Sequence, residues 1–392
     1  MNNRDALYAC AALLQERADE VVAAVAEESG LLEPRLRAEL ERTTGQLRLL
    51  GDHAAAPWRR ESAGIVTVPV PVGPVAVFAA SNFPLAFGVL GGDTGSAVAA
   101  GCPVVVKAHP AQPRTGGLLG EIGAATLPGF EVVFGGAETS IALVKDPRIK
   151  AVGFTGSFAG GRALMDAAAS RPDPIPVYAE MGSINPVFVL PGYDGPVDAL
   201  AASVTNSSGQ LCTKPGLVCT SSATFAAALA NVVADGATHR MLTPAMAANH
   251  GAWLAQAAKL GDVVVGEGDP APFAVIANEW HAEFGEEHFG PSVVIYVGSE
   301  LPEWEGSLTA TILAGPSDVD AARELLPLLM SRAGRVIWNG VPTGVAVVDA
   351  MMHGGPWPAS SYGWATSVGP ASIERFRRPV ALQGVPSEIL GS

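Results

Sequence analysis

The chain has 392 residues; apolar side chains make up 48% of them and charged side chains only 16%. The apolar content excludes a disordered chain, and the length predicts a large buried core and two domains. The 24 basic residues against 38 acidic ones give a net charge of −14, which excludes a nucleic-acid-binding role.

Cysteine and histidine usage argues against disulfides and against a metal. The cysteines Cys10, Cys102, Cys212 and Cys219 are too scattered for a disulfide framework or a zinc site, and the seven histidines show no paired spacing. Charges follow the short apolar stretch of the N-terminus at once, unlike in a signal peptide, and no run of about 18 uncharged apolar residues predicts a membrane span. We therefore expect a reduced, cytoplasmic protein without metal or membrane contact.

The first residues predict helices. Apolar residues at helical spacing, closed by glycines, indicate helical segments over 6–30 and 33–51. A stretch rich in proline and valine follows, from Trp58 to Pro74. Within it, residues 61–70 have the pattern of an extended edge strand, because prolines limit further pairing.

From Val75 onward, short apolar strands alternate with helices, which predicts a parallel sheet covered on both faces. This is an α/β, doubly wound nucleotide-binding arrangement, with ligands expected at the carboxyl ends of the strands. The strands are predicted over 74–80, 103–109, 130–135, 150–156 and 175–182, and the helices over 85–101, 115–127, 139–147 and 157–171.

A second α/β unit is predicted from about Ser183 to about Ser372, by the same alternation of apolar strands with helices. Its helical segments are 198–209, 224–236 and 318–332, and its strands are 186–191, 292–297, 308–314 and 334–339, with 377–386 as a candidate final strand.

Two side chains at strand ends are candidate ligand-binding groups. Ser157 is placed to cap a helix whose free N–H groups would bind an anion, with Gly156 and Gly161 allowing close approach. Lys107 ends an apolar strand, where it could hold ribose hydroxyls or phosphate. The alternatives are an ordinary strand-to-helix turn and a solvated lysine, and the GxGxxG fingerprint is absent.

Two further side chains are candidates for chemistry. Cys212 lies in a loop rich in serine, glycine and threonine, where Lys214 and backbone N–H groups would favour a thiolate. Glu180 ends a buried strand, where a carboxylate is costly unless it is paired or serves as a base. The alternatives are a buried structural cysteine and a structural glutamate that accepts backbone hydrogen bonds.

Six motifs follow one another along the chain: VFAASNFPLAF (77–87), CPVVVKAHP (102–110), VGFTGS (152–157), AEMGSINP (179–186), GQLCTKPG (209–216) and EEHFGPSVVI (286–295). Their order is the one found in NAD(P)-dependent aldehyde dehydrogenases, a family that the chain resembles from about Leu31 onward. The resemblance is greatest to the branch of 2-oxoglutarate semialdehyde (2,5-dioxopentanoate) dehydrogenases and NADP-dependent aldehyde dehydrogenases. It implies the aldehyde dehydrogenase fold, with a doubly wound cofactor domain and a second α/β catalytic domain.

The resemblance implies a covalent mechanism. Cys212 matches the nucleophile that forms a thiohemiacetal and then a thioester, and Asn82 matches the donor that stabilises the oxyanion. Glu180 matches the base that activates water for hydrolysis of the thioester. Its presence argues against the members that transfer the acyl group to coenzyme A.

The resemblance also assigns cofactor-binding residues. Lys107 matches the ribose-binding lysine, Gly156 and Ser157 match the pyrophosphate site, and Glu287 and Phe289 match the pair that positions the nicotinamide ribose and ring. The remaining cofactor-binding residues are predicted to be Ser81, His109, Gly135, Gly161 and Met181.

The sequence favours NADP, with NAD as the alternative cofactor. NAD-specific members commonly carry a glutamate three residues after the lysine, and this chain has Pro110 there, preceded by His109. Loss of that carboxylate removes repulsion toward a 2′-phosphate. Glu138 lies in the neighbouring loop, where NADP-binding relatives can carry an arginine.

The expected domains are a dinucleotide-binding domain over 1–57 and 75–182 and a catalytic domain over 183–375. The segments 58–74 and 376–392 are predicted to be shortened oligomerisation segments. By the resemblance, we expect the usual N-terminal extension of the family to be missing and the stretch between Cys212 and Glu287 to be shortened. We expect a homodimer.

The substrate is expected to be a small aldehyde, with 2-oxoglutarate semialdehyde or another semialdehyde as the candidate. Phe83, Phe87 and Trp357 line an apolar entrance or belong to the core. Arg162 and Lys214 are the visible cations for a distal carboxylate. The alternative function is a non-catalytic binding or structural protein that keeps the fold.

Overall fold

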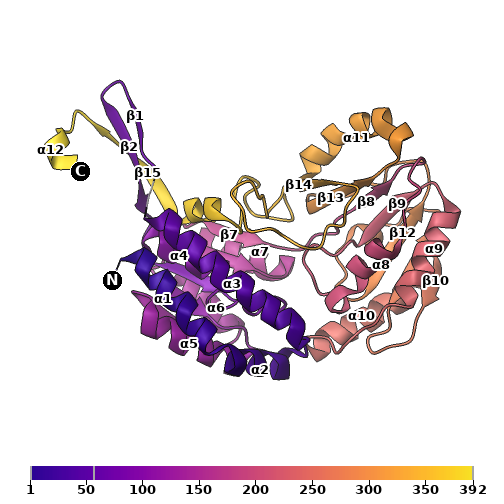
Figure 1. The fold of residues 1–392 in the computed structure, drawn as a ribbon, viewed down its shortest axis with the longest axis horizontal. Coiled ribbons are helices and arrows are strands. Elements are labelled where there is room, and N and C mark those ends of the chain that lie inside the picture. The colour runs from indigo at the N-terminus through magenta and orange to yellow at the C-terminus, as the bar shows by residue number, and fades with distance from the viewer. Residues whose placement is uncertain (1, 56–57, 391–392) are drawn as a thin grey trace.

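A computed structural model describes residues 2–55 and 58–390. The predicted domain boundary at residue 57 and the last two residues of the segment 376–392 lie outside the described residues. Three sheets with helices packed around them form two large halves and a projecting arm (Figure 1). The parallel order of most strands confirms the predicted α/β class.

The five-stranded sheet is entirely parallel, in the order β5-β4-β3-β6-β7. Successive residues of β3 point to opposite faces, so Val75 and Val77 enter one core and Ala76 and Phe78 the other. The strand order reverses between β3 and β6, which is where such sheets bind ligands. The strands are β3 (Val75–Phe78), β4 (Val104–Lys107), β5 (Phe130–Val133), β6 (Ala151–Thr155) and β7 (Val177–Glu180).

Helices cover both faces of this sheet. Residues of α5 (Pro113–Thr126) and α4 (Gly92–Ala100) share one core with the N-terminal helices. Residues of α6 (Ala137–Lys145) and α7 (Phe158–Ala169) share the other core. The sheet is therefore buried on both sides, as its apolar strands predicted.

The N-terminal helices are α1 (Asn3–Glu16), α2 (Ala18–Ser29) and α3 (Glu33–Ala54). The prediction of one segment over 6–30 is wrong, because the backbone leaves the helical region at Arg17 (φ −93°, ψ 18°). The bend lets α1 and α2 both contact α5. No helix in the described part of the chain is long and apolar enough to cross a membrane.

The helix predicted over 85–101 begins only at Gly92. Residues 79–91 instead form a buried loop after β3. A Cβ on Gly88 would lie 1.7 Å from the carbonyl oxygen of Pro84, and one on Gly91 would lie 2.5 Å from that of Ala86. Turns this tight admit only glycine, and they hold Ser81 and Asn82 at the sheet edge.

Glu39, in the middle of α3, anchors this loop. Its buried carboxylate accepts hydrogen bonds from the N–H groups of Leu85 (2.8 Å) and Ala86 (2.9 Å). Arg35 lies 3.7 Å from the same carboxylate. Burial raises the pKa of Glu39, against the opposing effect of Arg35 and the two N–H groups. The loop is therefore fixed to α3 by polar contacts inside the core.

The second half is built on a seven-stranded sheet, in the order β10-β11-β12-β9-β8-β13-β14. All neighbouring strands are parallel except β10 and β11. The predicted strands are present as β8 (Val187–Val189), β12 (Ser292–Val297), β13 (Ser307–Leu313) and β14 (Ala333–Trp338), and the predicted helices as α8 (Asp198–Thr205), α9 (Ala223–Ala234) and α11 (Val319–Arg332). The prediction missed β9 (Leu217–Thr220), α10 (Pro244–Ala257), β10 (Asp262–Val265) and β11 (Phe273–Ala277).

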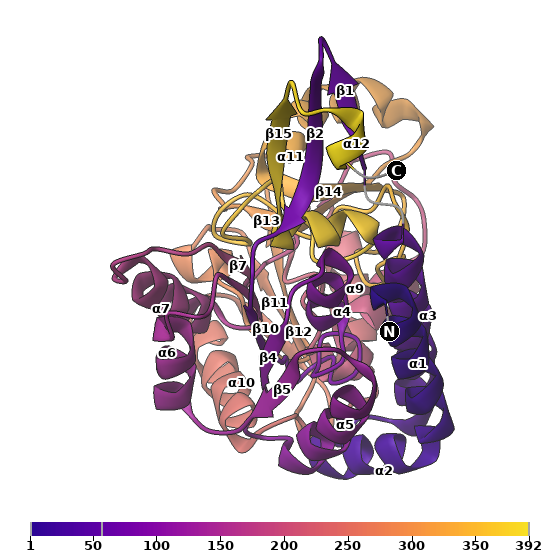
Figure 2. The same cartoon turned by 90° about the vertical axis from the view of Figure 1, so that its left-hand side faces the viewer.

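A three-stranded arm projects from the molecule (Figure 2). It consists of β1 (Arg60–Ser62), β2 (Ile65–Pro71) and β15 (Arg377–Gln383), followed by α12 (Ser387–Leu390). The predicted edge strand is wrong, because β2 lies in the centre of this sheet. Pro69 lies opposite Pro379, so the residues without an N–H group face each other.

We expect Glu39→Ala to lower the free energy of unfolding by about 3 kcal/mol, because two buried N–H groups and Arg35 lose their carboxylate. Urea denaturation measures the change. Glu41→Ala, on the exposed side of α3, is the matched control and should change stability by less than about 0.5 kcal/mol. An equal effect of the two variants would contradict the anchoring role.

Candidate active site

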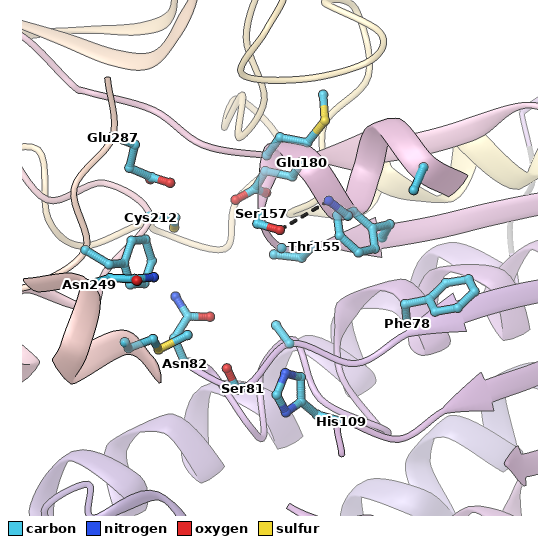
Figure 3. A pocket seen from close by; sticks show the side chains of 18 of the residues that line it. Phe78, Ser81, Asn82, His109, Thr155, Ser157, Glu180, Cys212, Asn249 and Glu287 are labelled. Carbon is cyan, nitrogen blue, oxygen red and sulfur yellow. Dashed lines mark hydrogen bonds between the residues drawn. The ribbon is translucent and has the colours of Figure 1, made fainter. Parts of the chain in front are cut away.

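The loops that follow the parallel strands of the five-stranded sheet meet at one cleft of about 970 Å³. Loops of the seven-stranded sheet, which carry Cys212 and Glu287, form the opposite wall (Figure 3). Of the site residues predicted from the sequence, the cleft is lined by Ser81, Asn82, Lys107, His109, Gly156, Ser157, Glu180, Met181, Cys212, Glu287 and Phe289.

Gly135 and Gly161 are the predicted cofactor residues that do not line the cleft. A Cβ on Gly161 would lie 2.6 Å from the Sδ atom of Met181, so this glycine lets α7 pack close to Met181. Gly135 has a φ of 142° and precedes Gly136, which does line the cleft. Both glycines therefore lie next to residues of the cleft wall, Met181 and Gly136, without lining the cleft themselves.

The loop that carries Cys212 is held in a strained conformation. Ser207 and Ser208 have φ values of 53° and 52°, a region that side chains other than glycine rarely adopt. The side-chain amide of Asn185 donates hydrogen bonds to the carbonyl groups of Cys212 (2.8 Å) and Lys214 (2.9 Å). These bonds fix the backbone on both sides of the thiol.

Cys212, Glu180 and His353 form one cluster, with their ligating atoms within 4.8 Å of one another. The Nε2 atom of His353 lies 3.7 Å from the Sγ atom of Cys212 and 3.1 Å from Oε1 of Glu180. The second contact lies within ion-pair distance, which is a salt bridge only when the imidazole carries a proton, and Oε1 accepts no aligned hydrogen bond from the described residues. The Ser367 hydroxyl donates to Oε2 of Glu180 (2.6 Å).

The surroundings shift the pKa values of Cys212 and Glu180 in opposite directions. Burial raises the pKa of Cys212 well above that of a free thiol, and the charges of Glu180 and Glu287 raise it further. Burial also opposes ionisation of Glu180, but His353 and Ser367 outweigh it and hold the pKa of this carboxyl below its ordinary value. At neutral pH the site therefore holds a carboxylate beside a thiol.

Asn82 reaches the cysteine loop from the sheet edge (Figure 3). Its side-chain amide donates a hydrogen bond to the carbonyl of Gln210 (3.1 Å), two residues before Cys212. Arg35 donates to the carbonyl of Asn82 itself (2.5 Å). An amide donor is thus held beside the thiol, as an oxyanion-binding group requires.

The other end of the cleft fits a dinucleotide. Ser157 caps the 12-residue helix α7 by accepting a hydrogen bond from the N–H group of Gly160 (3.2 Å), and both residues line the cleft. Lys107 is 7% exposed, burial lowers its pKa, and its ammonium has no hydrogen-bond partner within residues 2–55 and 58–390. The stem of Lys107 is therefore buried while the residue lines the cleft, where its ammonium is available to a phosphate or a sugar hydroxyl.

Beside Lys107 the cleft is uncharged. His109 has a pKa lowered to about 4 by burial and by the charge of Lys107, so its ring is neutral. Its Nδ1 atom accepts a hydrogen bond from the N–H group of Ala111 (3.2 Å). Pro110 lines the cleft, whereas Glu138 is exposed at the start of α6 and does not. No acidic side chain of residues 107–111 repels a phosphate here.

Glu287 lies opposite Glu180 across the cleft (Figure 3). Its carboxylate accepts a hydrogen bond from the N–H group of Ser183 (3.0 Å). Burial raises its pKa to about 7, against the effects of Ser183 and Lys214. The neutral form is then present near pH 7, and it can donate a hydrogen bond to a sugar hydroxyl.

The sequence did not indicate His353, which lies in the segment MMHGGPWPAS (351–360). It lies 141 residues from Cys212, so no local pattern could join the two.

The aromatic residues predicted to line a substrate entrance lie in different surroundings. Phe87 contacts the ring of His353 (5.9 Å between centroids), whereas Trp357 is 43% exposed against Phe158. The cysteine, histidine and glutamate could also hold a thiophilic cation, so the absence of a metal stays a prediction.

A dinucleotide-sized cleft that ends at a thiol beside a carboxylate defines the class as a nucleotide-dependent oxidoreductase. Residues 1–261 match the model of the aldehyde dehydrogenase family. The chain is 41% identical to alpha-ketoglutaric semialdehyde dehydrogenase 2 of Azospirillum brasilense, with 98% of this chain and 84% of the relative covered. It is 40% identical to alpha-ketoglutaric semialdehyde dehydrogenase of Acinetobacter baylyi, with 93% and 79% covered.

The chain belongs to the aldehyde dehydrogenase family. It is an NAD(P)⁺-dependent enzyme that oxidises an aldehyde to the carboxylic acid, which sets aside the non-catalytic alternative. Among solved structures, lactaldehyde dehydrogenase from Escherichia coli has the same fold, with a TM-score of 0.85 at 20% identity over 97% of this chain and 86% of the other.

The raised pKa of Cys212 predicts how its alkylation depends on pH. We expect the rate with iodoacetamide to keep rising above pH 9, because burial and the neighbouring carboxylates favour the thiol. Glu180→Gln removes one of these charges and should shift the profile to lower pH. Cys212→Ala supplies the background from the three other, buried cysteines. An unshifted profile in Glu180→Gln would contradict the coupling.

Proposed function

We propose that this enzyme oxidises a semialdehyde through a covalent intermediate on Cys212, with Glu180 as the base for hydrolysis and Asn82 as the oxyanion donor. The observation that carries the proposal is the cluster of Cys212, His353 and Glu180 at the end of a dinucleotide-sized cleft. The proposed division into a dinucleotide-binding domain, a catalytic domain and oligomerisation segments follows the three sheets.

The first step is attack of the Cys212 thiolate on the aldehyde carbon. The C–S bond forms while the carbonyl electron pair moves to oxygen, and the side-chain amide of Asn82 and the N–H group of Cys212 stabilise this oxyanion. The Nε2 atom of His353, 3.7 Å from Sγ of Cys212, takes the thiol proton, and the imidazolium then lies beside both the thiolate and the Glu180 carboxylate.

The oxyanion then collapses and releases a hydride from the same carbon, which leaves a thioester on Cys212. When bound, the oxidised nicotinamide accepts this hydride. Glu180 next takes a proton from a water molecule, whose oxygen attacks the thioester carbon. The C–S bond breaks, the acid leaves, and Cys212 is a thiolate again. The low pKa of Glu180 keeps it ready as a base.

We further propose that the preferred cofactor is NADP⁺. Lys107 would hold the adenine ribose and its phosphate, Gly156 and Ser157 the pyrophosphate, and Glu287 and Phe289 the nicotinamide end. The preference rests on the buried cation of Lys107 and on the lack of a carboxylate at positions 109 and 110.

The proposed substrate is an aldehyde that carries a distal carboxylate, such as alpha-ketoglutaric semialdehyde. Two relatives named for this substrate share 40% and 41% identity with the chain over more than nine tenths of its length. We also propose that the enzyme is a cytoplasmic homodimer. The projecting arm, whose strands are not covered by other sheets, is the segment through which two copies would associate.

Glu180→Gln should separate the two half-reactions. We expect one equivalent of reduced cofactor per active site in a rapid phase, then steady turnover slower by about 10²–10⁴-fold, because the thioester forms but water lacks its base. Stopped-flow absorbance at 340 nm, the band of the reduced nicotinamide, measures both phases; Glu131→Gln, exposed on β5, is the control. Cys212→Ala should show neither phase. Unchanged turnover in Glu180→Gln would exclude it as the base.

Cofactor choice is tested at position 110. Pro110→Glu should lower kcat/KM for NADP⁺ by about 10-fold relative to NAD⁺, because a carboxylate repels the 2′-phosphate and can bind the 2′-hydroxyl. Pro110→Gln has the same size without the charge and is the matched control. If the native enzyme already favours NAD⁺, or if both variants change the ratio equally, the proposed preference is wrong.

A further inference from the structure

Helix α3 presents two arginines to the interior near the active site. Arg35 and Arg42 are seven residues apart, which places them on one face of the helix, and Glu39 lies between them on the same face. Burial lowers the pKa of both arginines, but guanidinium groups remain protonated in proteins. Two buried positive charges therefore accompany one carboxylate.

These guanidinium groups are not saturated by the protein. The buried Nε and Nη2 atoms of Arg42 and the Nη1 atom of Arg35 have no hydrogen-bond partner among the described residues. Arg42 also has no carboxylate within ion-pair distance in the described part of the chain. Unpaired buried donors cost free energy, so these guanidinium groups favour an acceptor, and a negatively charged one pairs best with their charge.

The unsatisfied donors lie beside the reacting centre. The Cζ atoms of Arg35 and Arg42 lie 5.0 and 5.9 Å from the ring centre of Phe83, and that of Arg42 lies 5.6 Å from the ring centre of Phe87. Phe87 in turn contacts His353, the neighbour of Cys212. A thiolate at Cys212 is close enough to raise the pKa of both arginines.

A third arginine approaches from the seven-stranded sheet. Arg335 on β14 donates hydrogen bonds to the carbonyl groups of Pro342 (2.6 Å) and Gly344 (2.9 Å), but its buried Nε atom has no partner among the described residues. Val345, which follows in the same loop, packs in the cluster of Phe83 and Phe87. A thiolate at Cys212 also raises the pKa of Arg335.

The position of these donors excludes a role toward the cofactor. None of the three arginines lines the cleft that Lys107 and Ser157 share with Cys212. The two cations that the sequence offered for a distal carboxylate have partners elsewhere. Arg162 is exposed and pairs with Asp166 (2.9 Å), and the buried Lys214 donates to the carbonyl of Ser292 (2.8 Å).

We propose that Arg42, supported by Arg35 and Arg335, binds the distal carboxylate of the aldehyde substrate and makes the enzyme select anionic semialdehydes. The inference rests on the proposed function and assigns the specificity of the same site. The carboxylate would accept hydrogen bonds from the guanidinium donors while the aldehyde carbon meets Cys212. Charge-assisted bonds from a planar guanidinium suit this acceptor.

The experiment compares two aldehydes of equal chain length, 5-oxopentanoate and uncharged pentanal. The native enzyme should have the higher kcat/KM for 5-oxopentanoate. Arg42→Met should lower the ratio of kcat/KM for 5-oxopentanoate to that for pentanal by about 100-fold, because only the anionic substrate loses its partner. The charge of Arg42 also lowers the pKa of Cys212, so both values fall by a shared factor that cancels in the ratio. Arg42→Lys should recover part of the loss, since it restores the charge without the planar donors.

Arg37→Met is the matched control, because Arg37 lies on the exposed side of α3 and pairs with Glu33 and Asp19. It should leave both aldehydes unchanged. Turnover of pentanal shows that a variant is folded, so an unchanged ratio between the two aldehydes in Arg42→Met would overturn the proposal whatever their shared loss. No loss for either aldehyde would overturn it as well.

Binding without chemistry separates this proposal from the proposed function. In the Cys212→Ala background, titration calorimetry should show 5-oxopentanoate bound at least 10-fold more weakly after Arg42→Met. Should the native enzyme oxidise no aldehyde at all, the proposed function fails, and this measurement still decides the role of Arg42. Equal affinity in the two proteins would overturn that role.

Discussion

One imidazole joins the two halves of this active site. Nε2 of His353 lies 3.7 Å from the Cys212 sulfur and 3.1 Å from a Glu180 oxygen. Side chains from three segments that are distant in the sequence therefore meet at this point. Glu180 comes from the end of β7, Cys212 from the loop before β9, and His353 from the loop after β14. The contact fixes which acid is ionised at rest, because His353 lowers the pKa of Glu180 while burial keeps Cys212 protonated. Every proposed step starts from this distribution of protons.

The rigid loops around this contact follow from few residues. Gly88 and Gly91 permit turns that would otherwise collide with the backbone, and Glu39 ties the same loop to α3. Asn185 holds the cysteine loop from the opposite side. The donors that must meet a developing negative charge are thus positioned before a substrate arrives, which is the usual source of electrostatic stabilisation in enzymes.

Positions at strand ends were the part of the site that the hydrophobic pattern alone could predict, whereas Asn82, Glu287 and Phe289 were assigned by the resemblance to aldehyde dehydrogenases. Lys107, Ser157 and Glu180 follow apolar strands whose pattern is unambiguous, and parallel strands bring their carboxyl ends to one edge. His353 and Arg42 could not be predicted in this way, because their neighbours in space lie far away in the sequence. The sequence did not predict that α4 begins only at Gly92, because apolar residues in 85–91 keep a helical spacing. Only the close contacts of the glycines in this loop show why the helix begins later. The hydrophobic pattern of a sequence therefore indicates strands and helices more readily than it indicates contacts between residues that are distant in the sequence.

The pairing of β2 with β15 has a consequence for biosynthesis. These strands come from segments about 300 residues apart, yet they pair over seven positions. A ribosome releases β2 long before β15, so the five-stranded sheet can form while β2 still has no long partner strand. During that interval a nascent chain exposes backbone donors and acceptors that another chain could bind. The arm can therefore close only after β15 has been synthesised, later than the sheet that binds the cofactor.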